Sequence, residues 1–359
     1  MGIYNKILKP VFFKMDPEDV HNRVTKLGKV MGSNFISRSF VKRLFYFQHN
    51  SLHTTVAGIK FSNPVGLAAG FDKNANLYNI LPDVGFGFAE LGSVTGEKCS
   101  GNPRPRLFRL PDDKSIIVNY GLYNKGCEVI YDKLKDVKFR IPIGISVAKT
   151  NSPDIKTTEE GIKDYRKAFV TMHSIGSYTT INLSCPNTSD GQTFGYPENL
   201  DPLLKTLSKE KHLKPVFLKV KPDMTNSQFS EIIDIVEKHD WVNGFIIGNL
   251  TMDRNGLKTP KEIIDKMSPK GGLSGLPTQQ KSNNLIKFVH KNSDKLIIGC
   301  GGIFSGEDAY EKLKNGAVLV QLVTGLIFEG PSVISKINRE LVDIIQKKGY
   351  SNVSEIGKD

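Results

Sequence analysis

Residues 64–73 read PVGLAAGFDK, an apolar run followed by glycine, phenylalanine, aspartate and lysine. A short apolar run bounded by glycine is typical of a strand that is buried on both faces of a sheet. Further stretches share this character and alternate with segments of helical periodicity, such as 158–174, 226–239 and 306–315. The eight predicted strands are 64–69 (PVGLAA), 86–93 (FGFAELGS), 141–147 (IPIGISV), 178–184 (YTTINLS), 215–221 (PVFLKVK), 243–249 (NGFIIGN), 295–300 (KLIIGC) and 317–322 (AVLVQL).

This alternation predicts an α/β protein with a parallel sheet covered by helices, and eight repeats predict closure as a (β/α)₈, or TIM, barrel. The alternative is a doubly wound nucleotide-binding sheet, but no GxGxxG follows the first strand and no GxxxxGK[ST] occurs. The 359 residues of the chain exceed the roughly 250 of a typical barrel. We therefore assign residues 51–359 to the barrel and residues 1–50 to a small helical extension.

The extension has the pattern of basic amphipathic helices. Asp16 and Pro17 form a strong helix start, because the aspartate can accept hydrogen bonds from the first turn and proline suits the first helical position. Apolar residues then recur at helical spacing from Val20 to Met31, and basic residues outnumber acidic ones. Such helices can lie on an anionic membrane surface, or their apolar face can simply cover the barrel.

The chain carries 49 lysine and arginine residues against 37 acidic residues, a net charge of +12. This excess suits an anionic membrane surface, nucleic acid or anionic small molecules, although solvated lysines also produce it. Four cysteines without a CxxC pair favour neither a metal site nor a disulfide framework and indicate a reducing, cytosolic compartment. We find no apolar run long enough to span a bilayer and no secretory signal.

Two connections are longer than the others. The segment 94–140 contains two extended pieces, 106–110 and 115–118, which Pro111-Asp112-Asp113 joins as a predicted hairpin turn. The segment 185–198 follows the fourth strand and is rich in Gly, Ser, Thr, Asp and Asn. A polar loop of this length on a barrel is usually functional, so we predict a lid.

Glycine and polar residues gather where the predicted strands end. In a (β/α)₈ barrel these carboxyl ends form one rim, and the active site lies there. Gly301-Gly302 and Thr324-Gly325 follow the last two strands, and backbone amides without side chains can approach a phosphate closely. We therefore predict a phosphorylated cofactor at the barrel mouth, although turns also use glycine.

Charged and amide side chains at the same rim suggest a flat ligand. Lys219 lies in an apolar strand, and a buried ammonium needs an anionic partner. That partner is either the electron-rich N1–C2=O edge of a reduced flavin or a structural Asp or Glu. Lys73 either serves the site or pairs with the aspartate beside it. Asn182, Asn187 and Asn249 suit a flat, amide-bearing ring, or are turn residues.

Cys185 stands in the turn after the fourth strand, within NLSCPN (182–187). A free thiol titrates at about 8.5, and lower beside cations, so it can accept a proton. A lone cysteine is more often a small buried apolar residue, and we interpret Cys99, Cys127 and Cys300 in that way. The position of Cys185 at the rim, in an asparagine-rich turn, favours a catalytic base.

Several stretches together resemble the dihydroorotate dehydrogenase family over nearly the whole chain. The N-terminal DPEDVH (16–21) resembles its membrane-associated, quinone-reducing class 2 branch. The other stretches are NPVGLAAGFDKN (63–74), GFGFAELGSVT (85–95), GNPRPRLFRL (101–110), NLSCPNT (182–188), GGLSG (271–275), IIGCGGI (297–303) and GAVLVQLVTGLIFEGP (316–331).

The resemblance implies an oxidoreductase of pyrimidine biosynthesis that oxidises dihydroorotate to orotate with FMN. The base takes a proton from C5 while a hydride passes from C6 to flavin N5, and a quinone entering between the N-terminal helices reoxidises the cofactor. It also implies a cytoplasmic protein at the inner face of a membrane, with peripheral contact through residues 1–50 and neither a metal nor a nucleic-acid partner. By motif position, the implied FMN-binding residues are Ala69, Gly70, Lys73, Ser93, Ser146, Asn182, Lys219, Gly248, Gly275, Gly302, Val323 and Thr324; the substrate-binding residues are Lys73, Asn119, Gly121, Leu122, Asn182, Asn187 and Asn249; the base is Cys185; and the quinone-site residues are His21 and Arg109.

Some residues depart from the class 2 pattern. Cys185 stands where class 2 members usually carry serine, and in this respect it resembles the soluble class 1 enzymes. Val118 and Ser146 replace asparagines that contact substrate and FMN. Leu250 stands where a hydroxyl residue is usual, and Val323 where a tyrosine is usual. These departures leave the flavin site intact and concern the orotate half of the site and the electron acceptor.

Two other functions stay open. A tRNA dihydrouridine synthase is also an FMN barrel with a cysteine near an asparagine, and the basic charge favours it. A helical extension at the front of the chain, in place of an RNA-binding domain at the back, disfavours it. The second is a divergent relative with altered substrate or no turnover that binds flavin or a lipid surface, as the altered asparagine positions suggest.

Overall fold

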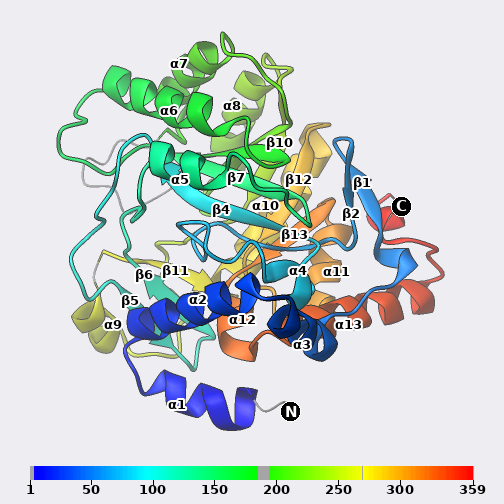
Figure 1. Cartoon of the computed structure of the whole chain (residues 1–359). Helices are drawn as coiled ribbons and strands as arrows, with labels where there is room; N and C mark the ends of the chain where they lie inside the picture. The colour runs from blue at the N-terminus through cyan, green and yellow to red at the C-terminus, as the bar shows by residue number, and fades with distance from the viewer. Residues whose placement is uncertain (1–3, 185–193, 269, 359) are drawn as a thin grey trace.

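The computed structural model describes residues 4–184, 194–268 and 270–358. Within these ranges, eight parallel strands close into a barrel in the order of the chain (Figure 1). Each overlaps one predicted strand, so the predicted (β/α)₈ barrel is confirmed. The barrel strands are β3 (Val65–Leu67), β4 (Phe88–Thr95), β7 (Ile143–Ala148), β8 (Tyr178–Asn182), β9 (Val216–Val220), β10 (Val242–Ile247), β12 (Leu296–Cys300) and β13 (Leu319–Leu322).

Helices cover the outside of the barrel, as strands that are apolar on both faces require. Two of the predicted helices begin with a capping box, at Thr157 and Thr225. In each, the threonine side chain accepts a hydrogen bond from a backbone amide of the first turn, and a side chain of that turn accepts one from the threonine amide. The helices around the barrel are α4 (Leu81–Val84), α5 (Cys127–Leu134), α6 (Thr158–Met172), α7 (Pro197–Leu207), α8 (Asn226–Val236), α9 (Lys261–Met267), α10 (Gln279–Asn292), α11 (Gly306–Lys314), α12 (Thr324–Glu329) and α13 (Val333–Lys348).

One end of the barrel is closed by apolar packing. The antiparallel pair β1 (Thr54–Val56) and β2 (Ile59–Phe61) precedes the first barrel strand. Phe61 packs edge-to-face on Phe88 of β4 with ring centroids 5.3 Å apart, in a cluster that includes Tyr178 of β8. Because these residues lie toward the amino ends of the strands, a site for small molecules is left to the opposite rim.

A second, smaller sheet lies beside the barrel. The predicted hairpin is confirmed as β5 (Leu107–Leu110) and β6 (Ser115–Val118). A third strand, β11 (Gly272–Gly275), pairs antiparallel with β6 so that Leu273 faces Ile117. We did not predict β11, because a glycine-rich segment of this length carries no strand periodicity and its pairing depends on a distant partner.

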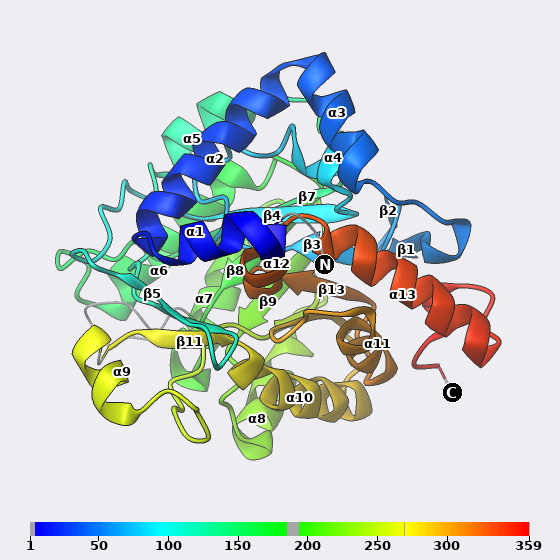
Figure 2. The ribbon, with the colours of Figure 1, turned by 90° about the horizontal axis from the view of Figure 1, so that it is seen from below.

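Within the described residues, the extension forms a π-helix, Tyr4–Leu8, and three α-helices, α1 (Lys9–Phe13), α2 (Pro17–Ser33) and α3 (Phe35–Phe45). The predicted helix start is confirmed, since the Asp16 carboxylate accepts a hydrogen bond from the Asp19 amide at 2.9 Å. Figure 2 shows α1 beside α12, where the Phe13 and Phe328 rings meet at 5.3 Å. The extension therefore packs near the end of the last barrel strand.

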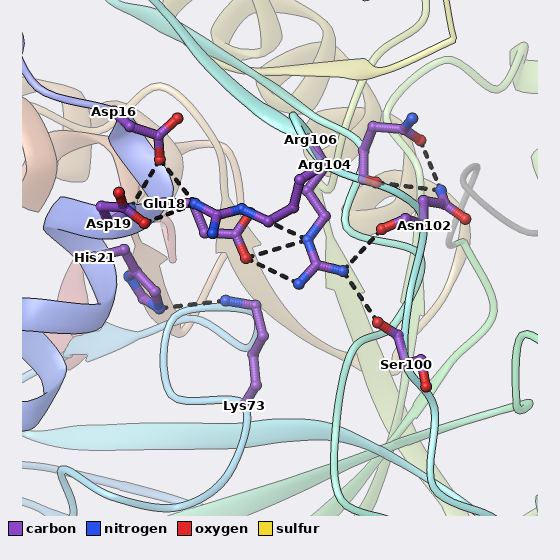
Figure 3. A network of polar contacts seen from close by, with 10 residues as sticks. Asp16, Glu18, Asp19, His21, Lys73, Ser100, Asn102, Arg104 and Arg106 are labelled. Carbon is purple, nitrogen blue, oxygen red and sulfur yellow. Dashed lines mark hydrogen bonds and ion pairs between the residues drawn. The ribbon is translucent and has the colours of Figure 1, made fainter.

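A buried ion pair also attaches α2 to the barrel (Figure 3). The guanidinium of Arg106, next to β5, donates to the Glu18 carboxylate at 2.8, 3.1 and 3.2 Å. Both side chains are about 7% exposed, and Arg106 also donates to the backbone oxygens of Ser100 and Asn102. Arg104 reaches Asp16 and Asp19 and also the same Glu18 carboxylate at 3.2 Å, but its own side chain is half exposed, so its removal leaves the buried Arg106–Glu18 pair in place.

We expect Glu18→Ala to lower the free energy of unfolding by about 3–5 kcal/mol, because it leaves the Arg106 charge buried without its partner. Thermal unfolding followed by circular dichroism measures the change. Arg104→Ala is the matched control from the same cluster, and we expect little change because that guanidinium is solvated. Equal effects of the two substitutions would contradict a special role for the buried pair.

Candidate active site

A pocket lies at the carboxyl ends of the barrel strands. It encloses about 1240 Å³, its open mouth included, between the strand ends, α2 and the β5–β6–β11 sheet. This volume suits a ligand larger than a single metabolite. The residues that line it at the strand ends are Ala68, Ala69, Gly70, Ser93, Asn182, Lys219, Asn249, Cys300, Gly301, Gly302, Val323 and Thr324.

Polar side chains in the pocket are held by one another. The Asn182 carboxamide donates to the Ser93 hydroxyl at 2.9 Å, and that hydroxyl lies 2.8 Å from the Ser146 hydroxyl. Asn249 donates to the hydroxyl of Ser184 at 2.8 Å. Ser146 thus lies behind the lining and orients Ser93, whereas Asn182 and Asn249 face the pocket in fixed positions.

Glycines form one wall of the pocket. Gly275 and Gly302 have φ of +83° and +71°, a region that favours glycine. A Cβ on Gly302 would lie 2.3 Å from the Gln279 Cβ, and one on Gly275 would lie 2.8 Å from the Thr324 Cγ2. At Gly70, with φ of +101°, a Cβ would meet nothing within 4 Å. The backbone is therefore bare on this wall, as the predicted phosphate site requires.

Lys219 is buried and lines the pocket from β9. Its ammonium lies 3.9 Å from a carboxylate oxygen of Glu90 on β4. The structural acid that we considered as a partner is therefore present. The separation exceeds a hydrogen bond, so Glu90 balances the charge of Lys219 and leaves its hydrogen-bonding capacity open toward the pocket.

Lys73 connects the pocket to α2. Its ammonium lies 3.3 Å from Nε2 of His21 and 3.9 Å from the centre of the Tyr120 ring. In Figure 3 the Lys73 and His21 side chains point toward each other. Burial, together with the Lys73 ammonium, lowers the pKa of His21 to about 2, so the imidazole is neutral and accepts the hydrogen bond. Burial also lowers the pKa of Lys73 to about 8, although the Glu18 carboxylate opposes this shift.

The aspartate beside Lys73 is engaged elsewhere. The Asp72 carboxylate accepts hydrogen bonds from the amides of Asn76 and Leu77, both at 2.7 Å. Asp72 therefore shapes the loop after β3, and the Lys73 side chain extends into the pocket instead. This arrangement favours a role for Lys73 in the site over the local ion pair.

The side of the pocket toward the extension is apolar. It is lined by Leu107 and Ile116 of the small sheet, by Ile303 and Ile327, and by Val323. Such a surface suits an apolar ligand.

Arg109 does not line the pocket within the described residues. Its guanidinium stacks on the Phe13 ring at 4.8 Å and donates to the Met15 backbone oxygen at 3.0 Å. It thus holds the junction between α1 and α2, beside the apolar side of the pocket.

Most predicted site residues come together in this pocket, and their roles stay predictions. Cys185 and Asn187 lie outside the described residues, as does most of the predicted lid. Asn119 is not in the lining; its side-chain oxygen accepts a hydrogen bond from Asn102 at 2.8 Å. Gly248 lies behind the pocket, where a Cβ would be 2.0 Å from the Cys300 backbone oxygen. The predicted residues in the lining are His21, Ala69, Gly70, Lys73, Ser93, Gly121, Leu122, Asn182, Lys219, Asn249, Gly275, Gly302, Val323 and Thr324.

Sequence reasoning assigned no site role to several other lining residues, among them Phe71, Tyr120 and Cys300. Phe71 and Tyr120 surround Lys73 and His21 with aromatic rings, but nothing in their sequence context distinguishes them from core residues. Cys300 is buried as expected, yet it also lines the pocket. Strand alternation could have indicated this position, because Cys300 shares the inward face of β12 with Ile298. Cys99 and Cys127 are buried, and each thiol donates to a backbone oxygen at 3.2 Å.

Comparisons with known proteins agree with the barrel fold and identify its family. The family model described as dihydroorotate dehydrogenase matches residues 51–345. The curated dihydroorotate dehydrogenase (quinone) of Christiangramia forsetii is 40% identical over 351 residues, 95% of this chain and 99% of the relative, and that of Natronomonas pharaonis is 35% identical over the full length of both. Among solved structures, the dihydroorotate dehydrogenase of Eimeria tenella in complex with ferulenol has a TM-score of 0.81 at 28% identity, covering 95% of this chain and 94% of that chain. The chain therefore belongs to the dihydroorotate dehydrogenase family.

Proposed function

We propose that this protein oxidises dihydroorotate to orotate, with FMN bound at the barrel mouth and a quinone as electron acceptor. The curated relatives named dihydroorotate dehydrogenase (quinone) support the reaction and the acceptor. The observation that carries the proposal is one pocket in which a lysine and two fixed asparagines, Lys73, Asn182 and Asn249, face a glycine wall.

The pocket fits FMN on the geometry of its wall. Bare backbone at Gly275 and Gly302 suits the phosphate, and the hydroxyls of Ser274 and Thr324, 2.7 Å apart, add donors beside it. Lys219 suits the electron-rich edge of the ring system. FMN, when bound, supplies the two-electron redox capacity that the side chains of this chain lack. The other residues assigned to it are Ala69, Gly70, Lys73, Ser93, Asn182 and Val323, with Ser146 and Gly248 behind them.

Dihydroorotate carries one carboxylate and a ring with amide groups. The Lys73 ammonium neutralises the carboxylate, and His21 and Tyr120 hold that ammonium at the pocket wall. The carboxamides of Asn182 and Asn249 each offer a donor and an acceptor to the ring amides. The backbone at Gly121 and Leu122 closes the other side of this subsite.

For the base we retain Cys185, which lies outside the described residues. Its Sγ would accept the proton from C5 of the substrate, which a thiol does readily when cations lie nearby. In the sequence NLSCPN, Cys185 directly follows Ser184, whose hydroxyl accepts the hydrogen bond from Asn249. Ser184, the last described residue of this segment, therefore lies beside Asn249, one residue before the proposed base in the sequence.

The helices of the extension lie beside the proposed quinone side of the pocket, and they also carry the residues proposed to contact the membrane. His21 of α2 lines the pocket, and Phe13 of α1 packs against the apolar cluster at its side. Large apolar side chains of the extension are exposed, up to 76% at Ile36. Exposed apolar residues on basic helices favour docking to an anionic lipid surface, from which a quinone could enter. Within the described residues, no helix combines the length and apolarity needed to cross a bilayer. The exposed residues are Ile7, Leu8, Val11, Val24, Leu27, Val30, Phe35, Ile36, Phe40 and Leu44.

The reaction is tested by anaerobic titration of the purified flavoprotein with dihydroorotate. We expect the flavin absorbance to bleach, and added quinone to restore it. A flavin that stays oxidised would exclude this substrate, and a protein without flavin would exclude the cofactor. Cys185→Ala is expected to slow the bleaching by roughly 10²–10⁴-fold, the range for loss of a general base. Cys127→Ala, which removes a buried thiol elsewhere, is the control.

We expect orotate binding to weaken as the pH rises through about 8. The pKa of Lys73 is lowered to about 8, so its charge is present below that pH and lost above it. The Kd for orotate, from the change in flavin absorbance, should rise by up to about tenfold between about pH 7 and pH 9, because the charged fraction of a group with a pKa of about 8 falls about tenfold over this range. Lys73→Met should bind weakly at both pH values. If the variant keeps the same pH profile, another group is responsible.

We expect Phe35→Ser with Ile36→Ser to reduce binding to vesicles of anionic phospholipid by more than about tenfold, because each residue loses apolar area that the lipid would bury. Sedimentation with vesicles measures the bound fraction. Val129→Ser, an exposed valine on α5, is the control. Unchanged vesicle binding by the double variant would refute membrane contact through α3.

A further inference from the structure

The interior of the barrel below the pocket contains charged and polar side chains. Glu90 on β4 approaches Lys219 on β9, and β7 and β8 separate these strands in the barrel wall. Gln321 on β13 likewise reaches the hydroxyl of Tyr178 on β8 at 3.4 Å, and these strands are not neighbours either. Contacts between strands that are not adjacent must cross the interior. Thr180 follows Tyr178 on the same face of β8 and points inward too.

Glu90 is fully buried. Among the described residues, both of its carboxylate oxygens lack a hydrogen-bond partner, as do the Thr180 hydroxyl and the Gln321 side-chain oxygen. A carboxylate in such a place is costly unless a cation balances it. The Lys219 ammonium, 3.9 Å away, is the cation that its side chain meets.

Lys219 therefore faces two ways. It lines the floor of the pocket, where the cofactor is proposed to lie, and it meets Glu90 on the side away from the pocket. Since charges in a buried site are weakly screened, the negative charge of Glu90 reduces the positive potential that Lys219 presents to the pocket. Glu90 itself does not line the pocket.

We propose that Glu90 is a positioning residue that sets the reduction potential of the flavin through Lys219. This inference rests on the proposed function, in which FMN occupies the pocket. Two-electron reduction adds negative charge to the flavin, and a lone Lys219 would stabilise that charge strongly. Glu90 offsets part of the stabilisation, so that the reduced cofactor gives up its electrons to the acceptor more readily.

The test is the midpoint potential of the FMN-bound protein, measured by equilibration with a redox dye of known potential. Glu90→Gln keeps the size of the side chain and removes its charge, and we expect it to raise the potential. Thr180→Val is the control, because it removes a hydroxyl in the barrel interior that has no hydrogen-bond partner among the described residues and leaves the charge unchanged. The midpoint potential of this variant should equal that of the unaltered protein. Glu90→Asp withdraws the carboxylate from Lys219 by one methylene, and we expect a smaller rise.

The outcomes separate the two proposals. If the unaltered protein binds no FMN, the proposed function fails. If FMN binds and Glu90→Gln leaves the potential unchanged, or shifts it no more than Thr180→Val does, the role of Glu90 is refuted while the proposed function stands. If Glu90→Gln does not fold, Glu90→Asp decides, because a potential equal to that of the unaltered protein would also refute the role.

Discussion

Closure of the eight-stranded barrel is the constraint on which the rest of the molecule depends. Because the strands are parallel and the sheet has no edge, their carboxyl ends meet on one rim. Residues as distant in the chain as Gly70 and Thr324 thereby line the same pocket. Packing of Phe61 on Phe88 closes the opposite end. The chemistry is thus confined to one mouth, where bare backbone and fixed carboxamides lie within reach of one ligand.

Two lysines give this mouth its positive character, and they are balanced differently. Lys219 is compensated from below by Glu90, across the barrel interior. Lys73 meets the neutral imidazole of His21 and the face of the Tyr120 ring, and among the described residues no carboxylate lies within ion-pair distance of its ammonium. Burial lowers the pKa of Lys73, so its ammonium loses a proton more easily than a solvated lysine does. An anionic ligand in the pocket can still pair with this ammonium.

The helical extension is part of this site as well as a cover for it. The buried Glu18–Arg106 pair joins α2 to the start of β5, and His21 lies one turn further along the same helix. A displacement of α2 would therefore change the surroundings of Lys73 as well as the apolar side of the pocket. The end of the pocket at Lys73 and its apolar side thus share one structural support.

The sequence by itself determined the barrel, the helix start at Asp16 and the hairpin of β5 and β6, because apolar periodicity, capping and turn residues act over a few neighbouring positions. It also indicated the glycine wall and Lys219, since the end of a predicted strand identifies the rim. Only the tertiary structure decided the partners of these groups: Glu90 for Lys219, His21 for Lys73, Asn102 for Asn119, and β6 for β11. These contacts join positions far apart in the chain, and their distances are set by barrel closure and by the packing of α2, which no local pattern encodes.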